Sequence, residues 1–154
     1  MKRIYIDRDK CQGCLTCVLA CMAEHNPAGK SVYQLNLTDR SAAMYNNILP
    51  GRGAAPTPVF CRHCDDPSCV RACMSGAMHK DPETGRVVHD KERCASCYMC
   101  VMSCEYGVLK TDLATRQVIQ KCDYCGAREA PRCVEECPSG AIEFKEVEPC
   151  ATLS

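Results

Sequence analysis

Cysteine spacing constrains this chain more than any other feature of its sequence. The 154 residues include 17 cysteines, far above ordinary usage, and 16 of them fall into four groups of four. The groups are group 1 (Cys11, Cys14, Cys17, Cys21), group 2 (Cys61, Cys64, Cys69, Cys73), group 3 (Cys94, Cys97, Cys100, Cys104) and group 4 (Cys122, Cys125, Cys133, Cys137). Cysteine at this density holds a small fold together through sulfur, in disulfides or in metal sites.

Charge and hydropathy exclude several classes of protein. Lysine plus arginine equals aspartate plus glutamate at 19 each, so no basic excess points to nucleic acid. The apolar runs are short and interrupted by charge, so we expect no direct membrane insertion. The first nine residues lack the apolar core of a signal peptide, which predicts the reducing cytoplasm. In that compartment dense cysteines are metal ligands rather than disulfides.

The spacing within each group predicts the metal chemistry. Groups 1 and 3 have the Cys-x2-Cys-x2-Cys-x3-Cys run of a [4Fe–4S] site, and groups 2 and 4 are longer versions of it. Two short steps wrap three thiolates around one face of a cluster, and the x3 step begins a helix that carries the fourth thiolate towards a neighbouring cluster. The four groups therefore predict four [4Fe–4S] clusters. The remaining cysteine, Cys150, is expected to be a bystander or a contact to a partner chain, not a ligand.

Repeats around the groups predict an α+β fold of short strands and short helices. In groups 2 to 4 the fourth cysteine begins a Cys-x-x-Gly-apolar-apolar stretch, typical of a short helix that ends at glycine before a strand. We expect strands at 2–7 and 141–147, and hairpins formed by 77–80 with 86–89 and by 108–111 with 117–120. The segment 22–60 is an insert rich in turn signals, either a binding surface or a cover over one cluster, with a short strand expected at 31–37.

Which cysteines share a cluster follows from the links between groups. In a two-cluster unit each run gives its first three cysteines to one cluster and its fourth to the other. Groups 2 and 3 are joined by a compact hairpin, whereas the long insert separates groups 1 and 2. The predicted sets are therefore Cys11, Cys14, Cys17 with Cys137; Cys122, Cys125, Cys133 with Cys21; Cys61, Cys64, Cys69 with Cys104; and Cys94, Cys97, Cys100 with Cys73. The sequential alternative, which pairs group 1 with 2 and group 3 with 4, remains open.

These sets imply two ferredoxin-like units nested in one chain. The outer unit comprises 1–21 and 105–147, and its first and last strands are expected to pair. The inner unit is 61–104, the insert is 22–60, and 148–154 is a tail.

The layout resembles the four-cluster electron-transfer subunits of bacterial anaerobic oxidoreductases, including the small subunits of dimethyl sulfoxide reductase, formate dehydrogenase and formate hydrogenlyase. Within that family, the stretches 60–80 and 94–107 look most like the ferredoxin-like partner of nickel carbon monoxide dehydrogenase. The resemblance implies nested cluster pairing. It also implies a partner that oxidises carbon monoxide, and a hydrogenase or a flavin-containing NAD(P) oxidoreductase as the acceptor. The sequence departs from the family in having proline directly after only the last group, at Pro138, and in its short tail.

Motifs for other chemistry are missing from the sequence, which predicts an electron carrier with no catalytic residue. Gly51-Arg52-Gly53 lies between prolines and is a loop rather than a dinucleotide fingerprint. Three alternatives stay open: a carrier for a tungsten or molybdenum aldehyde or formate oxidoreductase, a free soluble ferredoxin, and a zinc-binding structural module.

Charged and imidazole side chains near the cysteines are candidates for tuning a cluster or for docking a partner. They are Arg62, Arg71, Arg93, Lys121, Arg132, His63 and His79. We expect the cationic residues to be mainly solvated. For the two histidines we expect hydrogen bonding or solvation rather than metal ligation, since each cluster already has four cysteines.

Overall fold

The computed structural model describes residues 1–39, 44–51, 55–112, 119–126 and 128–147. In chain order the elements are β1 (Lys2–Ile6), α1 (Thr16–Glu24), the 3₁₀ helix η1 (Val32–Gln34), β2 (Asn47–Leu49), β3 (Thr57–Val59), α2 (Ser68–Arg71), β4 (Met78–Lys80), β5 (Val87–His89), α3 (Met99–Met102), β6 (Lys110–Thr111), β7 (Ile119–Gln120), α4 (Arg132–Glu135) and β8 (Ile142–Glu146). The mixture of short helices and short strands is the expected α+β class. Within the described residues, no helix has the length and apolar character needed to cross a membrane.

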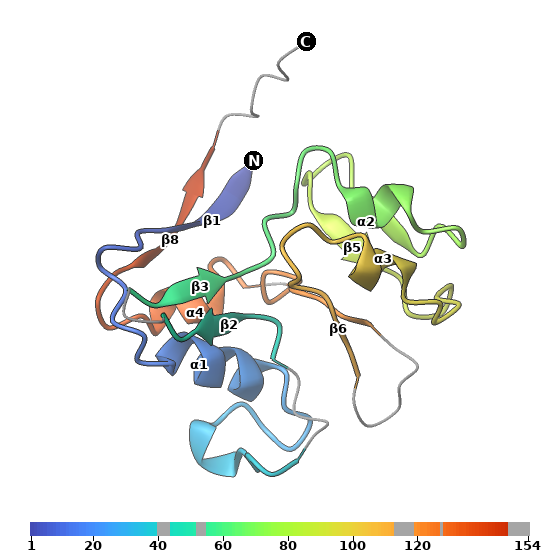
Figure 1. Cartoon of the computed structure of the whole chain (residues 1–154). Helices are drawn as coiled ribbons and strands as arrows, with labels where there is room; N and C mark the ends of the chain where they lie inside the picture. Colours follow the sequence, from blue (N-terminus) through green and yellow to red (C-terminus); the bar gives the residue numbers. More distant parts are fainter. Residues whose placement is uncertain (40–43, 52–54, 113–118, 127, 148–154) are drawn as a thin grey trace.

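The elements gather in two halves (Figure 1). One half holds β1, β8, α1, α4, β2 and β3, and the other holds α2, α3 and the β4–β5 hairpin, with β6 leaving its lower side. Every sheet of the described residues is a two-stranded antiparallel pair. Since such a pair is at most marginally stable alone in water, packing around the cysteine groups must supply the rest of the stability.

The expected pairing of the first and last strands is confirmed. β1 and β8 run antiparallel from Lys2↔Glu146 to Ile6↔Ile142. Ile4, Ile6 and Ile142 pack on the same core, which gives this ribbon one buried face. The strand pair brings the start of the chain next to the end of group 4.

Both expected hairpins are present. β4 pairs with β5 in the register Met78↔His89, across the turn that contains Asp81 and Gly85. β6 pairs with β7 through Lys110↔Gln120 and Thr111↔Ile119, and β6 begins two residues later than expected. The residues between β6 and β7, 113–118, lie outside the described part of the chain, as does Cys150.

The insert 22–60 differs from the prediction in two places. Thr57 and Pro58, which lie in one of its turn-like stretches, belong to β3, which pairs with β2 through Ile48↔Pro58. Proline is tolerated there because a two-stranded sheet has only edge strands, where a missing N–H need not break a ladder.

The strand expected at 31–37 is wrong. The Ser31 side chain accepts a hydrogen bond from Tyr33 N–H, and the Gln34 side chain accepts one from Ser31 N–H. This capping box starts η1 in place of an extended strand.

The helices follow the cysteine groups. α2, α3 and α4 each span four residues, as expected for a helix that turns once between the third and fourth cysteine. In group 2 the chain then reverses at Gly76, whose φ of 67° suits a residue without Cβ, and groups 3 and 4 have the same arrangement. α1 is longer at nine residues, because no glycine follows Cys21 and the helix continues to Glu24.

Two hydrophobic cores surround the cysteines. The first is in the half with α1 and contains Cys17, Val18, Met22, Ile48, Phe60, Cys133 and Ile142. The second contains Met78, Val87, Cys100 and Leu109. Cysteines are members of both cores, so the sulfur sites and the packing that excludes water from them are one structure.

Candidate metal centres

The loops that carry the cysteines adopt a backbone conformation that is rare elsewhere in the chain. Among the described residues, the non-glycine residues with positive φ are Leu15, His63, Ser96, Tyr98, Tyr124 and Cys125, and all six lie within a cysteine group. Left-handed backbone at residues with a Cβ costs free energy and persists only where the surroundings impose it. The tight wrapping that the Cys-x2-Cys steps predict is therefore present in all four groups.

None of the sixteen described cysteines is in a disulfide. They are also not arranged for one ion, since in the described part of the chain no group of three or more His, Cys, Asp or Glu could hold a single metal ion. We call the four predicted ligand sets A to D, and the contacts among their thiols are as follows.

Set A contains Cys11, Cys14, Cys17 and Cys137. Burial and the nearby Cys137, Cys14 and Cys11 thiolates together raise the pKa of Cys17 to about 12. All four cysteines line one small cavity, closed by Ile48 and Ile142. Cys14 is the exposed member.

Set B contains Cys21, Cys122, Cys125 and Cys133. Burial raises the pKa of Cys125 to about 11, and the Cys21 thiolate contributes to this rise. Burial and the Cys21 thiolate also raise the pKa of Cys133, and the Cys125 thiolate raises it by less than Cys21 does. Cys21, at the end of group 1, thus faces the thiols of group 4.

Set C contains Cys61, Cys64, Cys69 and Cys104. These four line a cavity of about 100 Å³ together with His63 and Val87. Burial and the Cys61, Cys104 and Cys64 thiolates together raise the pKa of Cys69 to about 11, against an opposing effect of Lys121.

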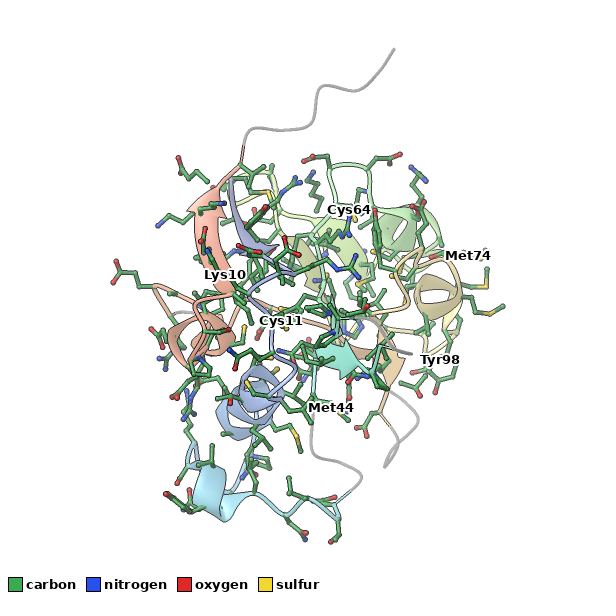
Figure 2. All side chains as sticks on the ribbon, turned by 60° about the vertical axis from the view of Figure 1, so that its left-hand side comes forward. Lys10, Cys11, Met44, Cys64, Met74 and Tyr98 are labelled. Atoms are coloured by element: carbon green, nitrogen blue, oxygen red, sulfur yellow. The ribbon has the colours of Figure 1, made fainter. Side chains whose placement is uncertain are left out.

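Set D contains Cys73, Cys94, Cys97 and Cys100. Burial raises the pKa of Cys100, and the thiolates of Cys73 and Cys94 contribute. Cys97 is exposed. Figure 2 shows Cys11 in the middle of the molecule and Cys64 in the half with α2 and α3. Met74 and Tyr98, which directly follow Cys73 and Cys97 in the sequence, lie at the outer edge of that half.

Hydrogen bonds favour the charged form at the fourth cysteine of groups 2 and 4. Burial raises the pKa of Cys73, but the Met78 N–H at 3.3 Å and the Ser75 hydroxyl at 3.6 Å from its Sγ lower it by more. Cys137 has a lowered pKa for the same reason, with Ser139 as its hydroxyl partner at 3.7 Å. Such donors offset the negative charge that thiolate-bound iron brings into the protein.

The residues fit [4Fe–4S] clusters. Sixteen reduced thiols form sets of four, backbone and hydroxyl groups donate to their sulfurs, and raised pKa values keep the buried thiols protonated until a metal displaces the proton. A bound cluster would supply one-electron redox chemistry to each set.

His25 is a residue near the cysteines that the sequence prediction missed. Its Nδ1 lies 2.9 Å from the Cys21 carbonyl oxygen and 3.8 Å from Cys21 Sγ, and its Nε2 lies 3.2 Å from Asp123 Oδ1. Burial lowers the pKa of His25, but Asp123 and Cys21 outweigh it and raise the pKa to about 10. The only signal in the sequence is its i+4 position relative to Cys21, on the same face of α1.

The cationic candidates divide into two classes. Arg62, Arg71 and Arg93 are exposed, in line with the expected solvation. Lys121 is 8% exposed and donates to the Cys122 carbonyl, and Arg132 lies beside the buried carboxylate of Glu24, so solvation is the wrong interpretation for these two. His79 is exposed, whereas His63 is 1% exposed and accepts a hydrogen bond from Val87 N–H.

Comparison with known proteins agrees with this chemistry. Two family models described as a 4Fe-4S dicluster domain match the protein, one over residues 54–147 and one over residues 10–78. Together they cover all four groups, which excludes the zinc-binding module.

Bacterial proteins named for dimethyl sulfoxide reductases and for a hydrogenase operon are similar to this chain. The probable anaerobic dimethyl sulfoxide reductase chain YnfG of Escherichia coli K12 is 37% identical, and the match covers 94% of this chain and 73% of that protein. The B subunit of the anaerobic dimethyl sulfoxide reductase of Haemophilus influenzae is 32% identical over 96% of this chain and 75% of its own length. The hydrogenase-2 operon protein HybA of Escherichia coli O157:H7 is 34% identical, and the match spans about half of it, 49%.

The fold recurs in a solved structure. One chain of the active site complex BamBC of benzoyl coenzyme A reductase matches with a TM-score of 0.53 and 21% identity, over 94% of this chain and 79% of that one. From the cysteine sets and these relatives, the chain belongs to the 4Fe–4S dicluster-domain family, carries four [4Fe–4S] clusters, and is an iron–sulfur electron-transfer subunit of an oxidoreductase complex, not its catalytic subunit.

Proposed function

We propose that this protein carries electrons one at a time through four clusters, from a carbon monoxide dehydrogenase to a hydrogenase or a flavin-containing NAD(P) oxidoreductase. The observation that carries the proposal is that the four thiol sets neighbour each other in series. The Cys17 thiolate of set A affects the pKa of Cys133 in set B, and the Cys61 thiolate of set C affects that of Cys122 in set B. Sets C and D share the core around Met78. The proposed order is therefore A, B, C, D.

The two ends of this series are the proposed contact points for partners. Cys14 in set A and Cys97 in set D are the exposed members among the sixteen described cysteines. Sets B and C each contain only buried or half-buried cysteines. An electron would therefore enter and leave near Cys14 and Cys97, while sets B and C connect the two ends.

The ligand assignment in this proposal is the nested one, with sets A to D as the four cluster sites and Cys150 as no ligand. It divides the chain into an outer unit of 1–21 and 105–147, the insert 22–60, the inner unit 61–104 and the tail 148–154. The interactions of Cys137 with Cys17, and of Cys21 with Cys133, support the crossing between groups 1 and 4.

A double substitution distinguishes the nested from the sequential assignment. Cys73 and Cys97 share one cluster in the nested assignment but belong to two different clusters in the sequential one. The nested assignment predicts that Cys73→Ala/Cys97→Ala retains about 12 of about 16 iron atoms per chain, as does Cys97→Ala alone. A fall to about 8 in the double variant would contradict it and favour the sequential alternative. Cys73→Ala/Cys14→Ala is the matched control, because it removes two clusters under the nested assignment and one under the sequential assignment.

The identity of the partner proteins is the most specific part of the proposal. The stretches 60–80 and 94–107 support carbon monoxide dehydrogenase as the donor, and the similarity to HybA, named for a hydrogenase operon, supports a hydrogenase as the acceptor. The alternative donor is a tungsten or molybdenum aldehyde or formate oxidoreductase. We place the protein in the cytoplasm because sixteen free thiols persist in a reducing compartment.

A reduction assay tests the partner. The cluster-loaded chain is mixed anaerobically with a catalytic amount of nickel carbon monoxide dehydrogenase, and the loss of visible absorption is followed after addition of carbon monoxide. The proposal predicts reduction of all four clusters at a rate that depends on the dehydrogenase concentration. Formate with a molybdenum formate dehydrogenase is the parallel reaction. Reduction by that pair alone would replace the proposed donor by the alternative.

A further inference from the structure

Two buried aromatic rings stack between group 2 and group 4. His63 and Tyr124 occupy the same position in their groups, directly before the second cysteine, and both have positive φ, 45° and 57°. Each is 1% exposed, and their ring centroids lie 3.9 Å apart with an interplanar angle of 37°. Tyr124 also contacts Phe144 of β8 edge-on at 5.3 Å. The stack thus joins the loop of set C to the loop of set B and to the β1–β8 ribbon.

The hydrogen bonds of His63 determine where its proton is. Nδ1 lies 3.0 Å from Val87 N–H and accepts from it, so the ring proton of neutral His63 is on Nε2. His63 is therefore a donor through one N–H only.

That N–H has no acceptor among the described residues. His63 Nε2 is fully buried and makes no hydrogen bond within the described part of the chain, and the same is true of the Tyr124 hydroxyl oxygen. A buried donor without a partner costs about 1–3 kcal/mol, so a folded protein retains one where something else accepts the bond. His63 lies in the wall of the cavity that the four cysteines of set C enclose. The [4Fe–4S] cluster expected in that cavity carries sulfur atoms that accept hydrogen bonds.

Set C also faces set B at this point. Burial has the largest effect on the pKa of Cys122, and the Cys61 thiolate has the second largest; both raise it. The thiolates of Cys122 and Cys61 also raise the pKa of Tyr124. No other pair of cysteines from these two sets is as strongly connected in the interactions described above. The ring stack therefore lies where the proposed series crosses from one half of the molecule to the other.

Building on the proposed function, we propose that His63 and Tyr124 form the junction between sets B and C: His63 Nε2–H donates a hydrogen bond to a sulfur of the cluster in set C, and the stacked rings fill the path between the two sets. One electron leaves set B and arrives at set C in this crossing, and His63 acts there as a hydrogen-bond donor that transfers no proton. A hydrogen bond to sulfur favours the more negative, reduced form. His63 therefore raises the reduction potential of set C.

The test uses a substitution that removes only the donor. Asparagine in His63→Asn can still accept from Val87 N–H and tolerates a positive φ, but it has no N–H in the Nε2 position. We expect the His63→Asn variant to bind about 16 iron atoms per chain, as the wild type does. We expect the midpoint potential of one of the four clusters to fall by about 59 mV, which corresponds to a tenfold change in the equilibrium constant for one-electron reduction. The potentials are measured by anaerobic redox titration followed by electron paramagnetic resonance.

Two further variants make the result specific. His63→Gln restores an amide N–H near the Nε2 position and is expected to recover the potential to within threefold of the wild-type equilibrium. His79→Asn, at an exposed histidine of β4, is the matched control and should leave all four potentials unchanged. Four unchanged potentials in His63→Asn would overturn the hydrogen bond. If His63→Asn binds less iron, pulsed resonance decides on the His25→Gln chain, which retains His63 and is labelled with ¹⁵N-histidine. The proposal requires a coupled imidazole nitrogen, and its absence refutes the bond.

The path through the rings has its own readout. After flash reduction of the cluster-loaded chain, electron redistribution among the clusters is expected to be about tenfold slower in Tyr124→Leu and within twofold of wild type in Tyr124→Phe. Equal rates in the Leu and Phe variants would overturn the role of the rings. A wild-type chain without about 16 iron atoms would instead refute the proposed function itself, so the two failures are distinguishable.

Discussion

Glu24 is a buried carboxylate whose removal tests how the insert is held on the rest of the fold. Its side chain is 5% exposed at the end of α1, and it faces Lys30 at 2.5 Å, Arg128 at 3.5 Å and Arg132 at 3.7 Å. Lys30 belongs to the insert, whereas the two arginines belong to group 4. One carboxylate thus connects three cations from two distant segments.

The magnitude follows from the burial of the three partners. Lys30 is 66% exposed, so its pair is worth less than about 1 kcal/mol. Arg132 is 16% exposed and forms an ion pair with the Glu24 carboxylate, and Arg128 donates a hydrogen bond to the same carboxylate at 3.5 Å; together such interactions of a buried charged group contribute about 1.5–3 kcal/mol. We therefore expect Glu24→Gln to lower the free energy of unfolding by about 2 kcal/mol, which corresponds to a fall in Tm of roughly 4–8 °C for a chain of this length.

The assay is the midpoint of loss of visible cluster absorption during anaerobic heating at one fixed rate. Glu143→Gln is the matched control, because Glu143 is 44% exposed and pairs only with Lys145 in the described contacts, which predicts a change within about 0.5 kcal/mol. Equal midpoints for the two variants would refute the reasoning.

The pH dependence of this effect has a definite sign. Burial raises the pKa of Glu24, but the three cations outweigh it, so the pKa is lower in the folded protein than the usual 4.5. A carboxyl group with a depressed pKa stabilises the fold above its unfolded pKa and loses that contribution as pH falls through its folded pKa. The difference in Tm between wild type and Glu24→Gln should be constant from pH 7 down to about 5 and should shrink below the unfolded value of about 4.5.

Three other experiments test the packing and the cysteine assignment. Met78→Ala, at a side chain 2% exposed in the core shared by sets C and D, should cost about 2–5 kcal/mol, measured by the same heating assay, and a cost under 1 kcal/mol would contradict its place in that core. Asn46→Ala removes the donor 3.1 Å from the Cys17 carbonyl oxygen and should cost about 1–2 kcal/mol; an unchanged Tm would mean that this bond does not hold the insert on α1. Cys150→Ala should retain about 16 iron atoms per chain while Cys14→Ala retains about 12, and equal iron contents would contradict the separation of ligands from the seventeenth cysteine.

Much of the fold near the cysteines could be predicted from the sequence because local chemistry determines it there. The Asp81-Pro82-Glu83-Thr84-Gly85 turn specifies the β4–β5 hairpin, where Gly85 N–H donates to the Asp81 carbonyl and the chain must reverse. The helix after the third cysteine is short because a glycine follows the fourth. Such signals act over a few residues and depend little on the rest of the chain.

The insert was harder because its structure depends on distant contacts. β2 and β3 have three residues each, too few for an alternating pattern, and their pairing is held where Ile48 packs on Cys17 and Phe60 in the first core. The Ser31 capping box was a local signal, but the alternating pattern at 31–37 favoured a strand in the prediction. Here a cap that forms two hydrogen bonds prevails over a β pattern with no partner strand.

The sulfur chemistry could be predicted residue by residue, whereas its surroundings could not. Spacing alone identifies the sixteen cysteines, because cluster binding imposes it directly. His25 contacts Asp123, which is 98 positions further along the chain. His63 stacks on Tyr124, which is 61 positions further along the chain. No pattern within one segment indicates such contacts, which depend on how the two halves pack.

The central claim is a protein with four [4Fe–4S] clusters that takes up electrons one at a time. Its most direct test is a reductive titration of the anaerobically prepared protein, with iron and acid-labile sulfide measured on the same sample. The account predicts about 16 iron and about 16 sulfide per chain, and an uptake of about four electrons. Half those values, or a protein that contains zinc, lacks sulfide and takes up no electrons, would contradict it.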